Sequence, residues 1–255
     1  MSGYYPGGLI ISFEGLDCCF KETNYETFVS RLLANHNDKY VNIFTESFPR
    51  YGKHMCIPVE KWLSGELDRN TLSNLPYATS SLYALDRMDY WHGVSNEKDL
   101  KYDVDTLYKY KQKNKRACFV FDRYSMSNIF YNSLNGDLNS PISKFELEYE
   151  ENHFGVPKPD IMVWMRSSSF LFIKNQLAIK QNKDENELNT DFLEKVWWRS
   201  ESIINHQANI FREAGIKLIT ITINNGLEPR SREEIANEVE DKIYEAVYDI
   251  FQYKY

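Results

Sequence analysis

A lysine in a glycine-led loop near the start of the chain is the first group that could do chemistry. The loop runs from Glu14 to Phe20, between an apolar run at 9–13 and a helical pattern that opens at Lys21. Strand, loop, lysine and helix are the layout of a phosphate-binding loop, in which backbone N–H groups and the positive end of a helix converge on an anion. A lysine at this point would reach the outer phosphates of a nucleotide. The stretch therefore predicts phosphate binding.

The loop departs from the usual pattern, G-x-x-x-x-G-K-[ST], at two positions. Gly15 and Lys21 keep the spacing, but Phe20 stands in place of the second glycine. Glu22 stands in place of the hydroxyl residue that holds magnesium, and Thr23 is the nearest hydroxyl that could substitute for it. By pattern alone, an ordinary strand, turn and helix without a ligand is an equally good interpretation.

Composition and charge are typical of one globular protein inside the cell. The chain of 255 residues has 42% hydrophobic and 15% aromatic residues, enough for one α/β domain with a full core. A net charge of −7 argues against a broad nucleic-acid surface. No apolar run approaches the roughly 20 residues that span a membrane, and residues 1–8 lack the features of a signal peptide. We expect a cytoplasmic protein that binds neither nucleic acid nor membranes.

Cysteine usage agrees with a reducing compartment. The spacing of the four cysteines fits neither a zinc site nor a secreted disulfide framework. The adjacent pair is interpreted as two small residues in a tight loop. The four are Cys18, Cys19, Cys56 and Cys118.

Five short apolar runs alternate with helical patterns along the chain. The runs predict strands at 9–13, 40–44, 117–121, 161–165 and 217–223. The helical patterns lie at 22–34, 57–64, 76–91, 101–115, 143–152, 168–179, 191–213 and 233–251. This alternation predicts a three-layer α/β fold, with a five-stranded parallel sheet flanked by helices in a single domain over 1–255.

Polar groups follow several predicted strands, at the edge where ligands bind to open parallel sheets. The second strand leads into 45–52, a loop with proline and glycine, and the third leads into Asp122 and Arg123. A charged segment at about 180–190 has no apolar anchors, which is typical of a mobile loop that could act as a lid.

Taken in order, these segments resemble the thymidylate kinases, a family of nucleoside monophosphate kinases on the phosphate-binding-loop fold. Five segments in the right order, at the right strand ends, are strongly specific. The loop segment Phe-Lys-Glu-Thr at 20–23 also resembles a bacterial and phage branch of that family. The five are Glu-Gly-Leu-Asp at 14–17, Ser-Phe-Pro at 47–49, Tyr-Ala-Leu-Asp-Arg at 83–87, Asp-Arg-Tyr-Ser-Met-Ser at 122–127 and Pro-Lys-Pro-Asp at 157–160.

The resemblance implies transfer of the ATP γ-phosphoryl group to the 5′-phosphate of dTMP, with Mg²⁺ accompanying ATP. In such a reaction the protein aligns two polyanions and neutralises developing charge. Lys21 would hold the β and γ phosphates, and Thr23 and Asp122 would hold the metal. The residues implied for ATP binding are Gly15, Cys18, Cys19, Phe20, Lys21, Glu22, Thr23, Asn224 and Asn225.

On the acceptor side, the resemblance implies contacts to the phosphate, the sugar and the base. Asp17 would lie near the acceptor's sugar and phosphate, and Arg123 would bind that phosphate. Tyr83 would stack on the pyrimidine and Arg87 would bind its O4 atom. Two further residues implied at the base are Phe48, at its edge, and Ser127, near N3 and O4.

Three implied contacts depart from the family pattern. The family often has an arginine where this chain has Tyr51, and the cation comes one place earlier, at Arg50, so either could reach the acceptor phosphate. The first loop offers no cation over the transferring group, which makes Lys180, or Lys183, the candidate. Glu187 would face the sugar and disfavour a 2′-hydroxyl.

Other interpretations stay open. Lys21 alone could be a solvated helix lysine, Arg123 part of a buried ion pair, and Tyr83 a core aromatic. The acceptor could be dUMP or another dNMP, because a methyl group contributes only about 1–3 kcal/mol of discrimination. The broken loop pattern also allows a nucleotide-binding homologue with weak or no turnover. Family members are commonly homodimers, and the helix that ends at Trp91 is the expected dimer surface.

Overall fold

The computed structural model describes residues 8–35, 42–68, 75–95, 117–132, 139–181 and 185–252. Within these ranges, one sheet holds five parallel strands in the order β2-β3-β1-β4-β5. The predicted five-stranded parallel sheet is therefore confirmed. The strands are β1 (Leu9–Gly15), β2 (Asn42–Ser47), β3 (Ala117–Asp122), β4 (Ile161–Arg166) and β5 (Lys217–Thr222).

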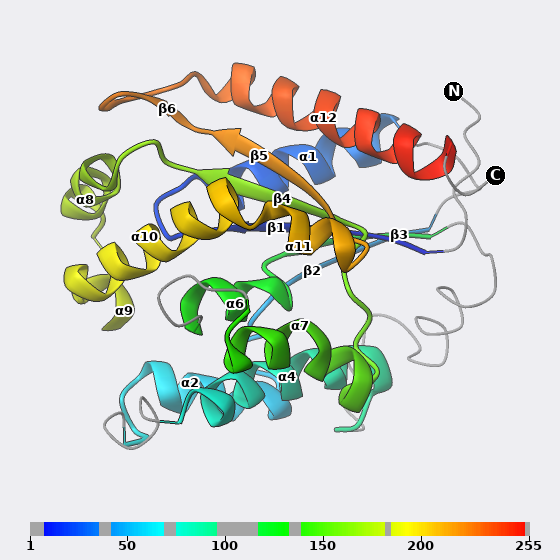
Figure 1. Cartoon of the computed structure of the whole chain (residues 1–255), viewed down its shortest axis with the longest axis vertical. Helices are drawn as coiled ribbons and strands as arrows, with labels where there is room; N and C mark the ends of the chain where they lie inside the picture. Colours follow the sequence, from blue (N-terminus) through cyan, green and yellow to red (C-terminus); the bar gives the residue numbers. More distant parts are fainter. Residues whose placement is uncertain are drawn as a thin grey trace.

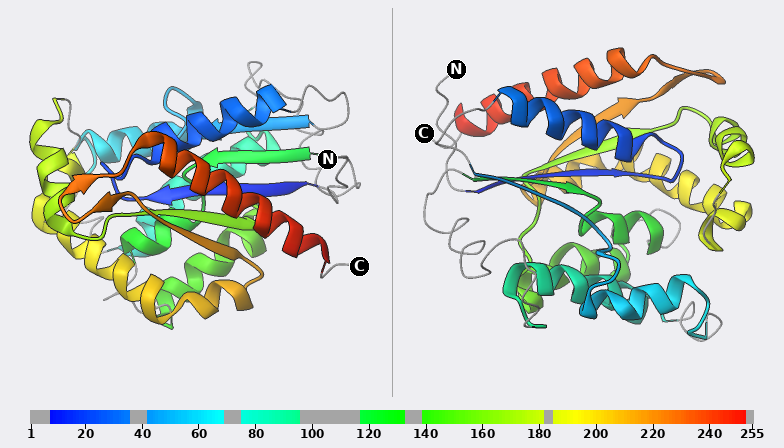
Figure 2. Two further views of the ribbon diagram at one scale, coloured as in Figure 1. Left: turned by 90° about the horizontal axis from the view of Figure 1, so that it is seen from above. Right: turned by 180° about the vertical axis from the view of Figure 1, so that it is seen from behind.

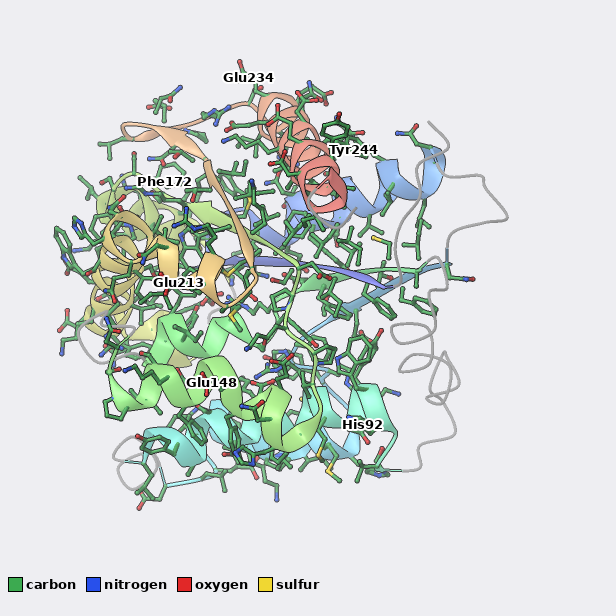
Figure 3. The ribbon with its side chains drawn as sticks, turned by 45° about the vertical axis from the view of Figure 1, so that its right-hand side comes forward. His92, Glu148, Phe172, Glu213, Glu234 and Tyr244 are labelled. Carbon is green, nitrogen blue, oxygen red and sulfur yellow. The ribbon has the colours of Figure 1, made fainter. Side chains whose placement is uncertain are left out.

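Helices cover both faces of this sheet, which confirms the three-layer α/β fold (Figure 1). One face carries α1 (Lys21–Asn35) and α12 (Arg232–Gln252). The other carries α4 (Pro76–His92), α6 (Met126–Asn132) and α7 (Pro141–Phe154). In Figure 3, Glu234 and Tyr244 mark α12 on one side of the molecule, and His92 and Glu148 mark α4 and α7 on the other.

Shorter elements complete the connections. The chain between β2 and β3 includes η1 (His54–Cys56) and α2 (Ile57–Leu63). Between β4 and β5 lie α8 (Phe170–Ile179), α9 (Glu185–Leu188), α10 (Thr190–His206) and α11 (Ala208–Glu213). A small antiparallel hairpin, β6 (Asn224–Asn225) with β7 (Glu228–Pro229), precedes α12. Among the helices described, none is both long and apolar enough to cross a membrane.

The central strands are apolar because helices cover them on both sides. Every residue of β1 and β3 is buried. Successive side chains of β1 point to opposite faces, so Phe13 packs on Phe28 of α1, while Ile10 joins a cluster with Phe119 and Trp91 on the α4 side. Burying one such side chain contributes roughly 1.5–3 kcal/mol.

Several boundaries differ from the sequence predictions. The second strand, predicted at 40–44, extends to Ser47, because 45–47 continue the ladder with β3; residues 40–41 lie outside the described residues. The helix predicted at 191–213 is two helices, since Gln207 leaves helical geometry (φ −130°) and α11 then packs Phe211 into the core. The predicted lid contains the short helix α9. The helix predicted at 101–115 lies outside the described residues.

The strand order brings loops from distant parts of the chain to one edge of the sheet. β1 lies between β3 and β4, with Phe13 opposite Asp122 and Gly15 opposite Met165. The strands run side by side in the same direction, as seen from above in Figure 2. Their carboxyl ends therefore meet where open parallel sheets bind ligands.

Candidate active site

The first loop takes a strained course between β1 and α1. Cys18 and Phe20 both adopt left-handed backbone conformations, with φ of 61° and 54°. Such a conformation costs an L residue roughly 1–2 kcal/mol, and glycine adopts it freely. Phe20 stands where the usual motif has glycine, so the backbone keeps a glycine-type conformation. Its ring turns towards α8 and packs edge-on against Phe172, with 6.0 Å between centroids.

Gly15 ends β1 in a place that admits no side chain. A Cβ atom there would lie 2.8 Å from the carbonyl oxygen of Met165 in β4. The carbonyl oxygen of Gly15 accepts a hydrogen bond of 3.1 Å from Nη1 of Arg123. The glycine therefore permits close packing of β1 on β4 and ties the first loop to the end of β3.

The N-terminus of α1 directly follows this loop and attracts anions. Lys21 is its first residue, and the backbone N–H of Asn24 donates to the carbonyl oxygen of Phe20 over 3.1 Å. The N–H groups before Asn24 have no acceptor within the helix, and they carry the positive end of its dipole. Glu22 is exposed and Thr23 is half-buried. The arrangement suits the binding of a phosphate.

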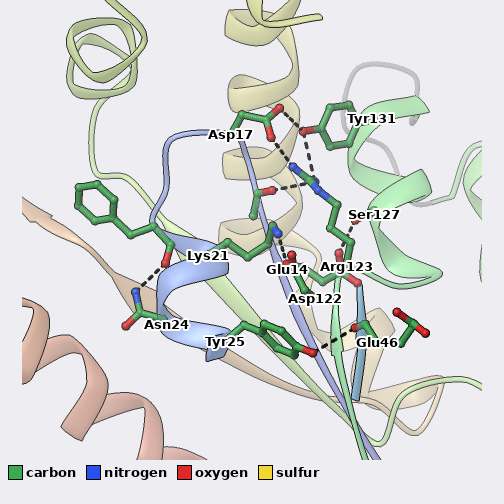
Figure 4. A network of polar contacts seen from close by, with 12 residues as sticks. Glu14, Asp17, Lys21, Asn24, Tyr25, Glu46, Asp122, Arg123, Ser127 and Tyr131 are labelled. Atoms are coloured by element: carbon green, nitrogen blue, oxygen red, sulfur yellow. Dashed lines mark hydrogen bonds and ion pairs between the residues drawn. The ribbon is translucent and has the colours of Figure 1, made fainter. Parts of the chain in front are cut away.

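Two cations and two carboxylates pair at the carboxyl ends of β1 and β3 (Figure 4). Nζ of Lys21 pairs with Asp122, and Nη2 of Arg123 pairs with Asp17. Tyr131 of α6 joins them, because its hydroxyl donates to Oδ2 of Asp17 over 3.3 Å and its ring lies 5.6 Å from the Arg123 guanidinium. The structure thus brings four predicted site residues together with one that sequence reasoning missed.

Arg123 is the third left-handed residue at this edge of the sheet, with φ of 60°. Its backbone N–H donates to the carbonyl oxygen of Phe13 over 2.9 Å, which holds the turn against β1. Left-handed non-glycine residues persist only where their surroundings enforce them, and they concentrate at functional sites. The strain therefore supports a functional role for the ends of β1 and β3.

Electrostatic pairing sets the charge state of this cluster. Burial lowers the pKa of Lys21 and the neighbouring Arg123 lowers it further, while Asp122 opposes both effects. Burial would raise the pKa of Asp17, but Arg123, Lys21 and Lys180 outweigh it and hold that pKa below its usual 3.8. An entering phosphate could take over the cations that these carboxylates now neutralise.

Glu14 lies completely buried beside the cluster, and sequence reasoning gave it no role. The hydroxyl of Ser127 donates to its Oε2, while its Oε1 has no hydrogen-bond partner among the described residues. Burial raises the pKa of Glu14 to about 7, although Ser127, Arg123 and Lys21 act to lower it. Ser127, predicted at the pyrimidine, is therefore bonded to a buried carboxyl group here.

Tyr83 and Arg87 lie one turn apart on α4, as predicted, but in different surroundings. Tyr83 is half-buried. Arg87 is 2% exposed, and Nε and Nη2 form a fork on the carboxylate of Glu150 in α7, at 2.7 and 2.6 Å. Asn128 of α6 also donates to Glu150. Glu150 and Asn128 had no assigned role in the sequence analysis, since neither lies in a segment singled out for chemistry.

The loop after β2 divides its three predicted residues between the interior and the surface. Phe48 is 4% exposed and packs within the core. Arg50 is 5% exposed, with Nε 2.8 Å from Asp86 and Nη2 2.8 Å from Asp89. Tyr51 is 63% exposed. Arg50 therefore ties the loop to α4, and the contacts of all three with an acceptor stay predictions.

The predicted lid places one cation near the first loop. Nζ of Lys180 pairs with Glu187, whose side chain is almost fully buried. Burial lowers the pKa of Lys180, but Glu187 and Asp17 outweigh it and raise that pKa, so the ammonium lies within electrostatic reach of Asp17. Arg166, at the end of β4, pairs with a glutamate of α10. Lys183 lies outside the described residues.

The asparagines after β5 differ from one another. Asn224 is buried: Oδ1 accepts from the backbone N–H of Ser168 over 2.9 Å, and Nδ2 donates to the carbonyl oxygen of Gly226 over 2.6 Å. Asn225 is exposed and lines a groove with Arg230. Asn224 thus holds the hairpin to the loop after β4, and only Asn225 presents its side chain to solvent.

The predicted magnesium ligands fit a metal that arrives with a nucleotide. No group of three or more His, Cys, Asp or Glu side chains within the described ranges is arranged to hold a metal ion. Mg²⁺ at nucleotide sites keeps several waters and uses one or two carboxylates together with substrate phosphates. Asp122 supplies one such carboxylate at the end of β3, and Thr23 lies two residues after Lys21 on α1.

Comparisons with known proteins point to one group of kinases. No family model matches the chain. In sequence, it is 23% identical over 226 residues to the thymidylate kinase of Schizosaccharomyces pombe, with 87% of each chain covered. In structure, it is similar to the thymidylate kinase of Candida albicans, with a TM-score of 0.54, 16% identity and coverage of 96% of this chain and 93% of that one. It is also similar to the thymidylate kinase of Ehrlichia chaffeensis, with a TM-score of 0.55, 14% identity and coverage of 93% and 100%.

Proposed function

We propose that the protein is a thymidylate kinase, which transfers the γ-phosphoryl group of ATP to dTMP and yields dTDP. One observation carries the proposal. Lys21 and Arg123, each paired with a carboxylate, meet at the carboxyl ends of β1 and β3, in a chain similar over most of its length to thymidylate kinases. Phosphoryl transfer needs this combination of positioning and charge neutralisation.

On the donor side, the N-terminus of α1 and Lys21 bind the ATP phosphates. Lys21 exchanges Asp122 for the β and γ phosphates, which carry more negative charge than one carboxylate. The left-handed conformation of Phe20 supports this role, because it gives the loop the glycine-type turn that phosphate binding uses. Mg²⁺ bound with ATP would add neutralising charge, and Asp122 and Thr23 are the residues that would hold it.

On the acceptor side, Arg123 binds the 5′-phosphate, and Asp17 lies beside the acceptor's sugar. Both are already oriented by their mutual ion pair and by Tyr131. Arg87 and Tyr83 recognise the pyrimidine ring. Lys180, in a lid at about 180–190, covers the transferring group and helps to exclude water.

Quaternary structure and location belong to the same proposal: a cytoplasmic homodimer in which each chain is a single kinase domain. The expected dimer surface is the helix that ends near Trp91, α4, and Trp91 itself is completely buried in the core. Exposed apolar groups lie at the other end of α4, where Leu75 and Tyr77 are 49% and 44% exposed. We place the dimer contact there.

A coupled ADP-release assay with ATP and dTMP, dUMP or dCMP tests the proposal. We expect turnover to be fastest with dTMP and to be largely lost in Lys21→Ala, with the fold intact by circular dichroism. Lys174→Ala, which removes an exposed lysine of α8, is the matched control and should keep its activity. ATP binding without turnover on any acceptor would indicate a non-catalytic homologue, and faster turnover with dUMP would change the acceptor.

A further inference from the structure

Helices α4, α6 and α7, which lie on the same face of the sheet, meet at one carboxylate. Glu150 of α7 is 4% exposed. Arg87 of α4 donates from Nε to Oε2 over 2.7 Å and from Nη2 to Oε1 over 2.6 Å. Asn128 of α6 donates from Nδ2 to the same Oε1 over 3.3 Å. Glu150 therefore fixes two side chains from separate helices relative to each other.

The fork on Glu150 decides what Arg87 can offer a ligand. A guanidinium has five N–H donors and no acceptor. Glu150 occupies the edge formed by Nε and Nη2. The fork uses two of the five N–H groups, and Nη1, whose two N–H groups make no hydrogen bond to the described residues, can bind a ligand. Arg87 thus presents a donor, in an orientation set by a bidentate ion pair.

The same carboxylate decides which way the amide of Asn128 points. Its Nδ2 donates to Oε1 of Glu150 and to the carbonyl oxygen of Ser80, both over 3.3 Å. Both amide hydrogens are therefore engaged by acceptors. A flipped amide would place Oδ1 against those two acceptors, which is unfavourable for a buried group. Asn128 thus keeps its oxygen, an acceptor, for a ligand, and its amide nitrogen shares Oε1 of Glu150 with Nη2 of Arg87.

We propose that Glu150 is a positioning residue: by orienting Arg87 and Asn128 it determines which pyrimidine bases the nucleotide-acceptor site binds. This proposal rests on the proposed function. A donor beside an acceptor complements thymine and uracil, which have an acceptor at O4 and a donor at N3–H. The same pair opposes cytosine, which has a donor at N4 and an acceptor at N3. Glu150 touches no substrate, and it acts through Arg87 and Asn128.

A purely structural role for Glu150 predicts a different result. Glu146, one turn earlier on α7, is also a buried carboxylate, and it accepts a hydrogen bond from the hydroxyl of Ser80 on α4. It ties α7 to α4 without a hydrogen bond to Arg87 or Asn128 in the described residues. If both carboxylates only held helices together, replacing either would weaken the binding of every acceptor alike.

Equilibrium binding of dTMP, dUMP and dCMP, measured by calorimetry without ATP, tests the proposal. We expect the wild type to prefer dTMP and dUMP to dCMP by at least about 100-fold, because a mismatched polar edge leaves buried groups unpaired. In Glu150→Gln, the ratio of the affinity for dTMP to that for dCMP should fall at least about tenfold. The new amide can donate a hydrogen bond to Asn128, so the Asn128 amide is free to flip. Glu146→Gln is the matched control and should keep the ratio, even if its Tm falls.

Two results would overturn the proposal. One is an unchanged dTMP-to-dCMP ratio in folded Glu150→Gln, and the other is a wild type that binds dCMP as tightly as dTMP. If Glu150→Gln does not fold, Asn128→Leu replaces it, because that change removes the acceptor that Glu150 orients at nearly constant size. An unchanged ratio there would overturn the proposal too. Binding without turnover would contradict the proposed kinase activity alone, so the two failures are distinguishable.

Discussion

Replacing Glu14 by glutamine should make the protein less sensitive to pH. In the wild type this carboxyl group is completely buried, with one oxygen bonded to Ser127 and the other without a partner among the described residues. Burial raises the pKa of Glu14 from 4.5 to about 7. The native protein therefore keeps a proton on Glu14 that the unfolded chain releases above pH 4.5.

The sign and size of the effect follow from this difference. Between the two pKa values the native state binds more protons than the unfolded state, so the free energy of unfolding falls as pH rises. The stabilisation is fully present below pH 4.5 and is lost as pH passes through about 7. Between pH 5 and pH 8 the loss amounts to about 2.5 kcal/mol, because one pKa unit corresponds to about 1.4 kcal/mol. Glutamine keeps the shape of the protonated acid and has no such proton.

Urea unfolding of the wild type and Glu14→Gln at several pH values from 5 to 8 measures the effect. We expect the stability of Glu14→Gln, relative to the wild type, to increase by about 2.5 kcal/mol across this range. Glu22→Gln removes an exposed carboxylate from the adjacent helix and serves as the control, with a difference that stays flat. A flat difference for Glu14→Gln as well would refute the reasoning, because it would mean that Glu14 is ionised throughout.

Three further predictions concern the loops around the site. Phe20→Gly should be more stable than Phe20→Ala by about 1 kcal/mol in urea unfolding, because both lose the contact with Phe172 but only glycine relaxes at φ 54°; the opposite order would show that the left-handed conformation carries no strain. Arg50→Ala leaves two buried carboxylates of α4 without their cation and should lower the free energy of unfolding by about 3–5 kcal/mol. The exposed Tyr51→Ala should change it by less than about 0.5 kcal/mol, and similar losses in both variants would contradict the placement of Arg50. Lys180→Ala should lower kcat at least about tenfold in the ADP-release assay, measured on protein shown to be folded by circular dichroism, because it removes the cation that the lid offers to the transferring group; an unchanged kcat would remove Lys180 from the transferring group.

The fold was predictable from the sequence because its signals are local. Apolar β-branched and aromatic runs become buried parallel strands wherever helices cover both faces, and the alternation with helical patterns leaves few other architectures. Four of the five strands of the parallel sheet begin at the predicted residue, and the predicted start of β2, at 40–41, lies outside the described residues. The extension of β2 to Ser47 and the break at Gln207 depend on packing partners elsewhere in the chain, which local periodicity does not encode.

The sequence by itself determined the identity and order of the groups at the strand ends, including Lys21, Asp122 and Arg123. Only the tertiary structure decided how those groups are paired, that Arg50 is held by two carboxylates of α4, and that buried Glu14 and Glu150 contact Ser127 and Arg87. The reason is physical. A motif fixes neighbours along the chain, whereas burial, pKa and hydrogen-bond partners depend on side chains that come from other helices and strands, and these are set only when the chain folds.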